Sequence, residues 1–308
     1  DASYSEADIT WTSSGDAIGD LANNVFTPNG TAAGTVTVTA TYSYLPYGAE
    51  TGEEVTVSDT ATISVNERAA APVTDGLIAF ADFDYDSGSS VYLQTGENAN
   101  VSAAYSTNST QSGTAHSGNA FAVSQNSDGM DTAPAITVSG LSNNETDGLS
   151  ISFWYYSTAG EDWNGILRNG NFRITFLNLC TDSGNLWPNG ADASSGSTSG
   201  GVLESGFAWD SISEAASAEN VWLYITVTVT SDAICFYLNG DLVCTYTNTA
   251  NSGVGRISSS LLTANSLTFF GNNQGSASFY IDDLLITTGM SAAEVAELYA
   301  AVNPTENA

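Results

Sequence analysis

Valine and threonine alternate along much of the first 67 residues, and this period of two predicts short β-strands. The clearest alternation lies in GTVTVTATYSY (34–44) and EVTVSDTATISV (54–65), with glycine, asparagine and proline turns between the apolar stretches. Because successive side chains of a strand point to opposite faces, each strand has one apolar and one polar face. The pattern predicts a small β-sandwich over residues 1–67.

The alternation ends at ERAAAPVTDG, a segment rich in alanine and proline. Such segments commonly join domains, because they neither alternate like strands nor show the apolar spacing of a helix. We therefore expect a linker at residues 68–75 and a second, larger domain at residues 76–308.

Apolar stretches in the second domain predict mostly strands, and the intervals between them are rich in glycine, serine, asparagine and aspartate. These stretches are GLIAFADFDYD, LSISFWYYS, NFRITFLNL, VWLYITVTVT, AICFYLNGDLVCTY, SLTFFGNN and SFYIDDLLITT. They predict an all-β domain.

One segment near the end of the chain has a helical pattern instead. Ser291 is followed three residues later by Glu294, which is the signature of a capping box at a helix N-terminus. Apolar residues then recur at helical spacing on one face. The segment predicts a helix over residues 291–302 that covers one edge or end of the sandwich through Val295, Leu298, Tyr299 and Val302.

The charge of the chain excludes several classes of partner. It carries 34 acidic and 4 basic residues, with a formal net charge of -30 and no lysine. A surface this negative repels phosphate backbones and anionic headgroups, so we expect neither nucleic acid nor membrane surfaces as partners. No apolar run approaches the roughly 20 residues that a membrane span requires, and no signal peptide opens the chain. We expect a processed or excised fragment without membrane insertion, whose ligands are neutral molecules or cations.

The cysteines leave one disulfide open. Asn239-Gly240 is a strong hairpin signal, and counting outward from this turn places Cys235 opposite Cys244. As a non-hydrogen-bonded pair their Cα atoms would lie about 4.5 Å apart, within disulfide range. The alternatives are this disulfide or two reduced, half-buried thiols, and Cys180 is free in either case.

Two family resemblances rest on these motifs. The order ITWTSSGDAIGDLANNVFTPNGTAAGTVTVTATYSY…DTATISVNE resembles bacterial Ig-like domains of surface proteins. The strand GLIAFADFDYD, the tryptophan-bearing LSISFWYY, the YLNGDLV hairpin, and IDDLLI leading into the capped helix resemble, in that order, bacterial laminin-G-like, concanavalin A-like jelly rolls. The resemblance implies an all-β chain: an N-terminal Ig-like β-sandwich followed by a concanavalin A-like (laminin-G-like) jelly-roll sandwich with a short C-terminal helix. It also implies carbohydrate binding, although the same sandwich occurs in lectins, enzymes and spacers.

We do not expect an enzyme. Retaining glycosidases need two carboxylates about 5 to 5.5 Å apart, and hydrolases that resemble this fold carry Glu-x-Asp-x-x-Glu or Glu-x-Asp-x-Glu on a strand. Neither pattern occurs in this sequence.

Aspartates at the ends of two predicted strands suggest a structural calcium ion, because calcium prefers carboxylate and carbonyl oxygens. In many relatives of the resembling family, a calcium joins the first strand to the last. The matching positions are Asp82 and Asp84 in ADFDYD and Asp282 in YIDDLL. The alternative is that these residues are solvated acids in a chain that has many of them.

The tryptophans divide into two groups. Trp11, Trp154 and Trp222 lie inside strand patterns, and we expect them in hydrophobic cores. The other three lie in turn-rich segments among polar residues, a mixture that suits a sugar ring with its apolar C–H face and polar rim. The alternative is that individual rings anchor their loops. The expected carbohydrate-binding residues are Trp163, Trp187, Trp209, Asp162, Asn164, Arg168, Asn185, Asn189 and Asp210.

Taken together, these features predict non-catalytic carbohydrate binding by an extracellular protein, secreted or on a bacterial cell surface. The charge favours a neutral polysaccharide or oligosaccharide, and α-glucan (starch or maltooligosaccharide) is the first choice. That choice rests on the similarity of the lysine-free, acidic composition to starch-adherence and other glycan-binding proteins of gut bacteria. We expect a monomer within a larger multidomain surface protein. The alternatives are an adhesin for a host protein or glycoprotein, and a structural spacer.

Overall fold

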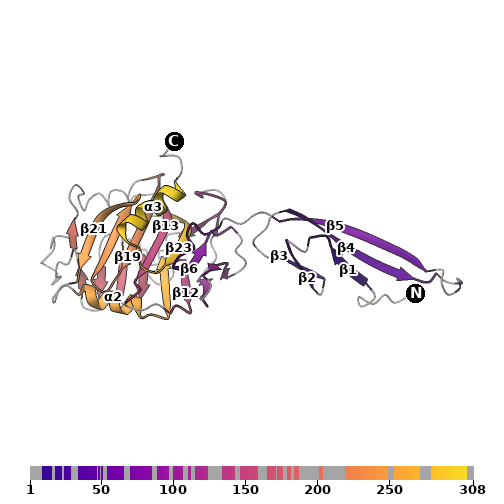
Figure 1. Cartoon of the computed structure of the whole chain (residues 1–308), viewed down its shortest axis with the longest axis horizontal. Coiled ribbons are helices and arrows are strands. Elements are labelled where there is room, and N and C mark those ends of the chain that lie inside the picture. Colours follow the sequence, from indigo (N-terminus) through magenta and orange to yellow (C-terminus); the bar gives the residue numbers. More distant parts are fainter. Residues whose placement is uncertain are drawn as a thin grey trace. The chain divides into compact units, whose positions relative to one another are not determined.

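The computed structural model divides the chain into two compact units, Asp1–Ala70 and Ala71–Ala308, which we call unit 1 and unit 2. Each unit is described by itself (Figure 1). The residues that the structure describes are 9–15, 18–22, 24–28, 34–46, 48, 50, 54–65, 70–84, 89–96, 100–106, 110–111, 115–123, 134–142, 146–158, 165–170, 172–175, 179–181, 184–186, 201–203, 219–248, 253–270 and 279–303.

Unit 1 contains a three-stranded antiparallel sheet in the order β1-β4-β5 and a separate β2-β3 hairpin. The valine and threonine alternation makes one face of the sheet apolar and the other polar. On the apolar face, Val36 and Val38 are buried, whereas Trp11 is 38% exposed, so the prediction of a core position for Trp11 is wrong. An Ig-like sandwich remains a prediction for this unit. The strands are β1 (Ile9–Ser13), β2 (Gly19–Ala22), β3 (Val25–Pro28), β4 (Gly34–Tyr44) and β5 (Val55–Val65).

Unit 2 is a sandwich of two antiparallel sheets, as the apolar stretches predict. The larger sheet has the order β10-β11-β23-β13-β19-β20-β21-β18, with β6 paired to β23 and β8 paired to β6. The described part of this sheet comprises β6 (Leu77–Ala81), β8 (Gln94–Thr95), β10 (Thr110–Gln111), β11 (Ala120–Val123), β13 (Leu149–Ser157), β18 (Gly201–Leu203), β19 (Trp222–Val229), β20 (Ala233–Leu238), β21 (Asp241–Thr247) and β23 (Phe279–Thr287).

The second sheet of unit 2 has the order β17-β16-β15-β14-β22-β12-β9-β7. Its strands are β7 (Ser90–Val91), β9 (Ser102–Tyr105), β12 (Ala135–Ser139), β14 (Gly165–Asn169), β15 (Phe172–Thr175), β16 (Leu179–Thr181), β17 (Gly184–Leu186) and β22 (Ser266–Phe270). Alternate residues of both sheets form one hydrophobic core, which includes Phe153 of β13, Val227 of β19 and Ile136 of β12.

A helix that the sequence pattern did not reveal contributes to the same core. Helix α2 (Val254–Leu262) places Val254, Ile257 and Leu261 in the hydrophobic cluster. Its N-cap is Gly253, with no side-chain cap hydrogen bond. Three consecutive serines and the missing capping signal hide this helix from sequence analysis.

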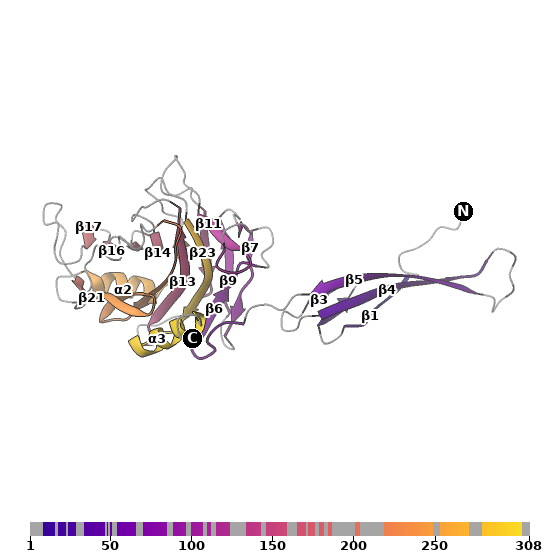
Figure 2. The same cartoon turned by 90° about the horizontal axis from the view of Figure 1, so that it is seen from above.

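Helix α3 (Ala292–Val302) confirms the predicted capping box. Glu294 N–H donates to Ser291 Oγ, and Ser291 N–H donates to Glu294 Oε2. The helix lies across the outer face of the larger sheet (Figure 1). There Leu298 joins a second hydrophobic cluster with Phe80, Trp154, Tyr224 and Leu285. The outer face of this sheet is therefore apolar where α3 covers it, and Figure 2 shows the helix from a second direction. Among the described residues, no helix has the length and apolar character needed to cross a membrane.

The predicted hairpin turn between β20 and β21 is confirmed. Asn239 and Gly240 have φ angles of 50° and 84°. Both lie in the left-handed region that a two-residue hairpin turn of this sequence requires. Leu238 pairs with Asp241 beside the turn, as the sequence predicts.

The predicted opposition of Cys235 and Cys244 is wrong. The register shifts between Phe236 and Tyr237, so that Cys244 pairs with Phe236 and Cys235 pairs with Thr245. Because paired residues share a face and successive residues alternate, the two cysteines point to opposite faces of the sheet. Cys244 is buried in the core, whereas Cys235 Sγ lies 3.7 Å from Thr245 Oγ1, and neither cysteine forms a disulfide.

This geometry predicts the behaviour of the thiols. Mild oxidation should form no disulfide between Cys235 and Cys244, because a β-sheet separates their sulfur atoms. Peptide mapping of the oxidised, unreduced protein by mass spectrometry measures this directly. Recovery of a peptide that joins the two cysteines would show that the bulge is absent in solution.

Candidate functional site

Aromatic side chains form a row on the outer face of the larger sheet, beyond the area that α3 covers. Tyr156 of β13 pairs directly with Tyr280 of β23 on one side and with Trp222 of β19 on the other. Directly paired residues project from the same face. Phe153 and Tyr155 of β13 point into the core, so the alternation directs Tyr156 outward.

The rings of this aromatic row contact one another and remain partly exposed. The centroids of Tyr156 and Trp222 lie 5.2 Å apart with an interplanar angle of 46°, and those of Tyr156 and Tyr280 lie 6.0 Å apart at 72°. The Tyr156 hydroxyl donates to Asn220 Oδ1 at 3.0 Å. Because the residues are fixed on neighbouring strands and the Tyr156 hydroxyl is held by Asn220, the row is an ordered apolar surface.

His116 extends this surface toward the helix. Its ring stacks on buried Trp154 at a centroid distance of 3.9 Å and an interplanar angle of 13°, and it meets the edge of Trp222 at 5.9 Å. Burial of one face of the ring lowers the pKa of His116. The indole Nε1 of Trp154 is buried and has no hydrogen-bond partner. An unpaired donor therefore lies beneath the aromatic surface.

Buried carboxylates lie next to these rings. Asp282 pairs with Trp154 across β23 and β13 and is fully buried. Its Oδ2 accepts hydrogen bonds from the backbone N–H groups of His116 and Ser117, both at 2.9 Å. Asp282 thus fixes the segment that positions the His116 ring. The pKa of Asp282 is raised to about 8, mainly by burial and also by the neighbouring carboxylate Asp283, and the backbone hydrogen bonds offset part of this increase.

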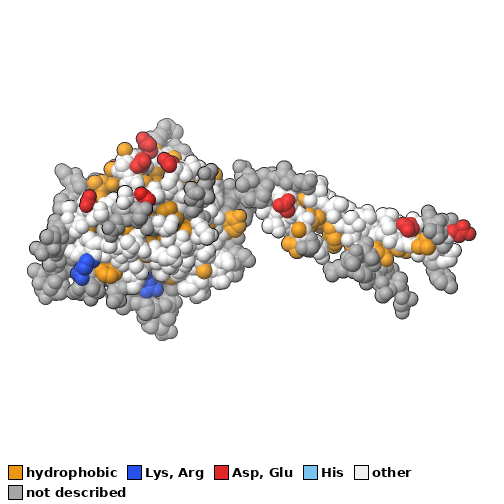
Figure 3. Space-filling view, turned by 60° about the horizontal axis from the view of Figure 1, so that its bottom comes forward, with side chains coloured by type: hydrophobic (Ala, Val, Ile, Leu, Met, Phe, Trp, Pro, Cys, Tyr) orange, Lys and Arg blue, Asp and Glu red, His pale blue; other side chains and the backbone are white. Residues whose placement is uncertain are grey.

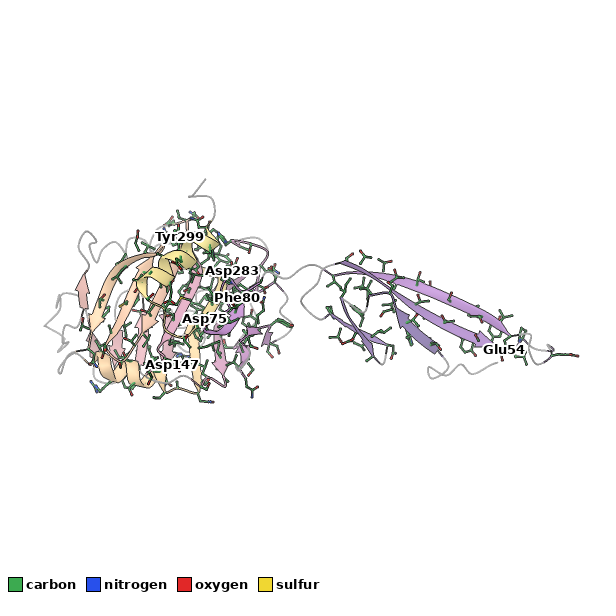
Figure 4. The ribbon with its side chains drawn as sticks, viewed as in Figure 1. Glu54, Asp75, Phe80, Asp147, Asp283 and Tyr299 are labelled. Carbon is green, nitrogen blue, oxygen red and sulfur yellow. The ribbon has the colours of Figure 1, made fainter. Side chains whose placement is uncertain are left out.

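Asp283 faces the acidic residues that follow β6, and sequence analysis did not single it out. The pKa of Asp283 is raised to about 7, mainly by burial and also by the charges of Asp82 and Asp84. Asp82 is buried, and Asp84 Oδ1 accepts a hydrogen bond from Asn119 N–H at 2.6 Å. Figure 4 labels Asp283 together with Phe80 of β6 and Tyr299 of α3 in unit 2. The four aspartates form an acidic cluster, which we define as Asp82, Asp84, Asp282 and Asp283.

The acidic cluster fits a cation by charge but not by distance. Carboxylate oxygens are the ligands that calcium prefers, and buried carboxylates that repel one another gain most from a positive ion. Within the described part of the chain, however, no group of three or more aspartate, glutamate, histidine or cysteine side chains is close enough to hold a metal ion. A bound cation would require further oxygen ligands or a small approach of the carboxylates.

The predicted carbohydrate-binding residues are only partly covered by the structure. Arg168 lies on β14 of the smaller sheet, whereas the aromatic row lies on the larger one, so the two are not brought together. Asn185 lies in β17, and only its backbone is described. The remaining predicted residues lie outside the described ones: Trp163, Trp187, Trp209, Asp162, Asn164, Asn189 and Asp210.

Of the two tryptophans of unit 2 predicted to lie in a core, Trp154 does and Trp222 does so only in part. Trp154 is 4% exposed in the cluster beneath α3, while Trp222 packs only partly against that cluster. A signal for the row was present in the sequence, because LSISFWYYS contains four consecutive aromatic residues, FWYY, so that both alternating sets of the strand carry aromatic rings there. Such a strand is covered on both faces or exposes aromatic rings on one of them.

Two facing antiparallel sheets, one shared core and a helix over the outer face define a concanavalin A-like β-sandwich. The sequence profile described as "Concanavalin A-like lectin/glucanases superfamily" matches residues 128–296, more than half of the chain. The chain therefore belongs to this family, Laminin_G_3. Comparison with curated proteins finds no match.

Solved structures resemble the chain at low sequence identity. The binding domain of botulinum neurotoxin DC, in complex with SialylT, is 15% identical at a TM-score of 0.45, covering 74% of this chain and 52% of that one. Domain 4 of AbnA, an extracellular GH43 arabinanase of Geobacillus stearothermophilus in complex with arabinotriose, is 17% identical. Its TM-score is 0.45, and the match covers 72% of this chain and 98% of that one. A sialidase of Trypanosoma rangeli is 12% identical at a TM-score of 0.41, and the match covers 76% of this chain and 34% of that one. The chain spans about half the length of the neurotoxin structures that it matches. SialylT and arabinotriose are ligands of the matched proteins.

Proposed function

We propose that unit 2 binds a carbohydrate without cleaving it and that the aromatic row is the contact surface. The observation that carries this proposal is the ordered, partly exposed row of Tyr280, Tyr156 and Trp222 across three neighbouring strands. Sugar rings present apolar C–H faces that pack on aromatic rings, and their hydroxyl groups need polar partners nearby. Exposed Asn220 and Glu219 supply amide and carboxylate groups next to Trp222.

A neutral glycan suits the electrostatics of this surface. The chain has a formal net charge of -30, and Figure 3 shows red acidic side chains and few blue basic ones on the face in view. Sialylated or sulfated glycans would be repelled. Among neutral glycans we propose an α-glucan first, on the resemblance of the composition to starch-adherence proteins.

Binding without cleavage and an extracellular location are parts of the same proposal. The sequence lacks the paired acidic strand motif of the hydrolases that resemble this fold. Display outside the cell, on a bacterial surface or after secretion, agrees with the lysine-free composition.

We further propose that calcium supports the site without taking part in any reaction. The acidic cluster would supply hard oxygen ligands, and backbone carbonyls or water would complete the six to eight oxygens that calcium takes. The cation would compensate the repulsion that Asp82 and Asp84 exert on Asp283. Asp282 would then hold the His116 segment against the aromatic row through its backbone hydrogen bonds.

Affinity electrophoresis of the full chain tests the carbohydrate proposal. The gels contain starch, another neutral polysaccharide, or none. We expect starch to retard the wild type and Trp222→Ala to weaken binding at least tenfold, about 1.4 kcal/mol, because the largest ring of the row is lost. Trp222→Phe should retain part of the affinity. Tyr92→Ala is the matched control, since Tyr92 is an aromatic residue of unit 2 that is 48% exposed outside the row.

The pattern of retardation separates the possible outcomes. Loss of binding in Trp187→Ala but not in Trp222→Ala would move the site to the NLWPNG segment. Retardation by another neutral polysaccharide and not by starch would overturn only the α-glucan assignment. If no glycan retards the wild type, carbohydrate binding is wrong, and the adhesin or spacer alternatives take its place.

A further inference from the structure

The second sheet of unit 2 carries arginine as its only charged residue type. Among the described residues, none of its strands contains an aspartate or a glutamate. The larger sheet, by contrast, contains Asp241, Asp282 and Asp283. In a chain with 34 acidic and 4 basic residues, an acid-free sheet that holds Arg168 and Arg173 is a marked segregation of charge.

These two arginines lie side by side on the outer face of the sheet. They are directly paired across β14 and β15, so their Cβ atoms lie about 5 Å apart on one face. The adjacent pair, Leu167 and Ile174, belongs to the hydrophobic core. Because side chains alternate along a strand, Arg168 and Arg173 project from the opposite, outer face, where both are half-buried. Two guanidinium groups are thus held next to each other by hydrogen-bonded strands.

Hydroxyl groups continue this face beside the arginine pair. Thr268 of β22 pairs with Arg168, and Thr137 of β12 pairs with Thr268, so the polar row continues across β22 and β12. Two residues further along these strands, and therefore on the same face, Ser139 Oγ and Ser266 Oγ lie 3.1 Å apart. The surface next to the guanidinium groups is polar and rich in groups that donate and accept hydrogen bonds.

The chemistry of this face favours a carboxylate on a sugar. Each guanidinium has five N–H donors in a planar fork, and the fork matches the two oxygens of a carboxylate. The threonine and serine hydroxyls suit the hydroxyl groups of a sugar ring. The formal net charge of -30 does not prevent binding, because salt at physiological strength screens exposed charges that lie beyond about 8 Å.

We infer that the Arg168–Arg173 pair binds the carboxylate of a uronic acid residue in a glycan, with Thr268 and Thr137 next to the sugar hydroxyls. The site lies on the smaller sheet, whereas the aromatic row lies on the larger one. Unit 2 thereby has one surface for neutral sugar rings and a second surface for an acidic sugar. The choice of a sugar over an acidic peptide rests on the proposed carbohydrate-binding function.

Ligand-observed NMR titration of the full chain tests this inference. The probe is a disaccharide with one glucuronic acid residue, and its methyl ester is the uncharged control. We expect the acid to bind about tenfold more tightly than the ester, and Arg168→Gln or Arg173→Gln to weaken binding of the acid about tenfold. Arg168→Lys should recover little, because lysine keeps the charge but lacks the fork. Arg256→Gln removes the same charge from an exposed position of α2 and should bind the acid like the wild type.

Comparison of the probes and variants separates this inference from its alternatives. Equal binding of acid and ester by the wild type, a result that needs no variant, would overturn it, and so would an equal loss in Arg256→Gln. A terminally blocked peptide with one glutamate that binds as tightly as the disaccharide would overturn the sugar assignment in favour of an acidic peptide. Loss of acid binding in Trp222→Ala would move the acidic sugar to the aromatic row. If starch fails to retard the wild type while the acid still binds through the arginines, only the proposed function of the aromatic row is wrong.

Discussion

In the presence of a chelator, the free energy of unfolding of unit 2 should fall as the pH rises from about 4 to about 8. Asp282 and Asp283 have pKa values raised to about 8 and about 7 by burial and by neighbouring carboxylates. In this pH range the folded chain keeps protons that the unfolded chain has released, so deprotonation favours unfolding. Since one pKa unit corresponds to about 1.4 kcal/mol, the loss is on the order of a few kcal/mol.

Asp283→Asn isolates this effect. Asp283 has a φ of 51°, and asparagine tolerates this left-handed conformation as aspartate does. The variant should be more stable than the wild type at pH 8 and should lose less stability between pH 4 and pH 8. Asp241→Asn, which removes an exposed acid, is the control for net charge. Urea unfolding across this pH range measures the difference.

Calcium should reverse this loss in the wild type. A bound cation compensates the repulsion within the acidic cluster, so calcium should raise the melting temperature at pH 8 and have little effect on Asp283→Asn. An equal effect of calcium on both proteins would argue against a site at Asp283. A wild-type stability that stays level between pH 4 and pH 8 in chelator would contradict the raised pKa values themselves.

Leu298→Ala should destabilise unit 2 by about 2–5 kcal/mol, the usual range for a buried leucine. Leu298 is 2% exposed and joins α3 to Phe80, Trp154 and Leu285 on the outer face of the larger sheet. Removing its side chain leaves a cavity beneath a short helix, because the neighbouring strands cannot move to fill it. Denaturant unfolding followed by circular dichroism measures the change.

Two controls define this prediction. Leu298→Met keeps the volume and should cost less than about 1.5 kcal/mol. Glu297→Ala changes an exposed neighbour on α3 and should stay within about 0.5 kcal/mol. A change of that small size for Leu298→Ala would mean that α3 is not packed on the sheet in solution.

Much of the fold of unit 2 follows from local patterns in the sequence. The alternation in LSISFWYYS and VWLYITVTVT determines strands β13 and β19, and Ser291 with Glu294 determines the start of α3. Helix α2 was missed because its capping signal is absent. The bulge beside Phe236 was missed because a register shift depends on how two strands pack, and no single residue in CFYLNGDLVC announces it.

The candidate site was less predictable from sequence. Asp82, Asp84 and Asp282 were identified from the resemblance, but Asp283 gains its importance only because the β23 bulge turns it toward Asp82 and Asp84. The aromatic row is assembled from Tyr156, Trp222 and Tyr280, which are far apart in the sequence. Their proximity is a consequence of the β23-β13-β19 strand order.

The all-β class, the strand-rich sandwich, the capped helix and the acidic, lysine-free composition follow from the sequence alone, because periodicity, capping and charge are local or additive properties. The neighbours of each strand became known from the three-dimensional fold, and with them the aromatic rings that share a face, the carboxylates that repel one another and the cysteines that lie apart. These properties depend on register and strand order, which arise from packing between segments distant in the chain.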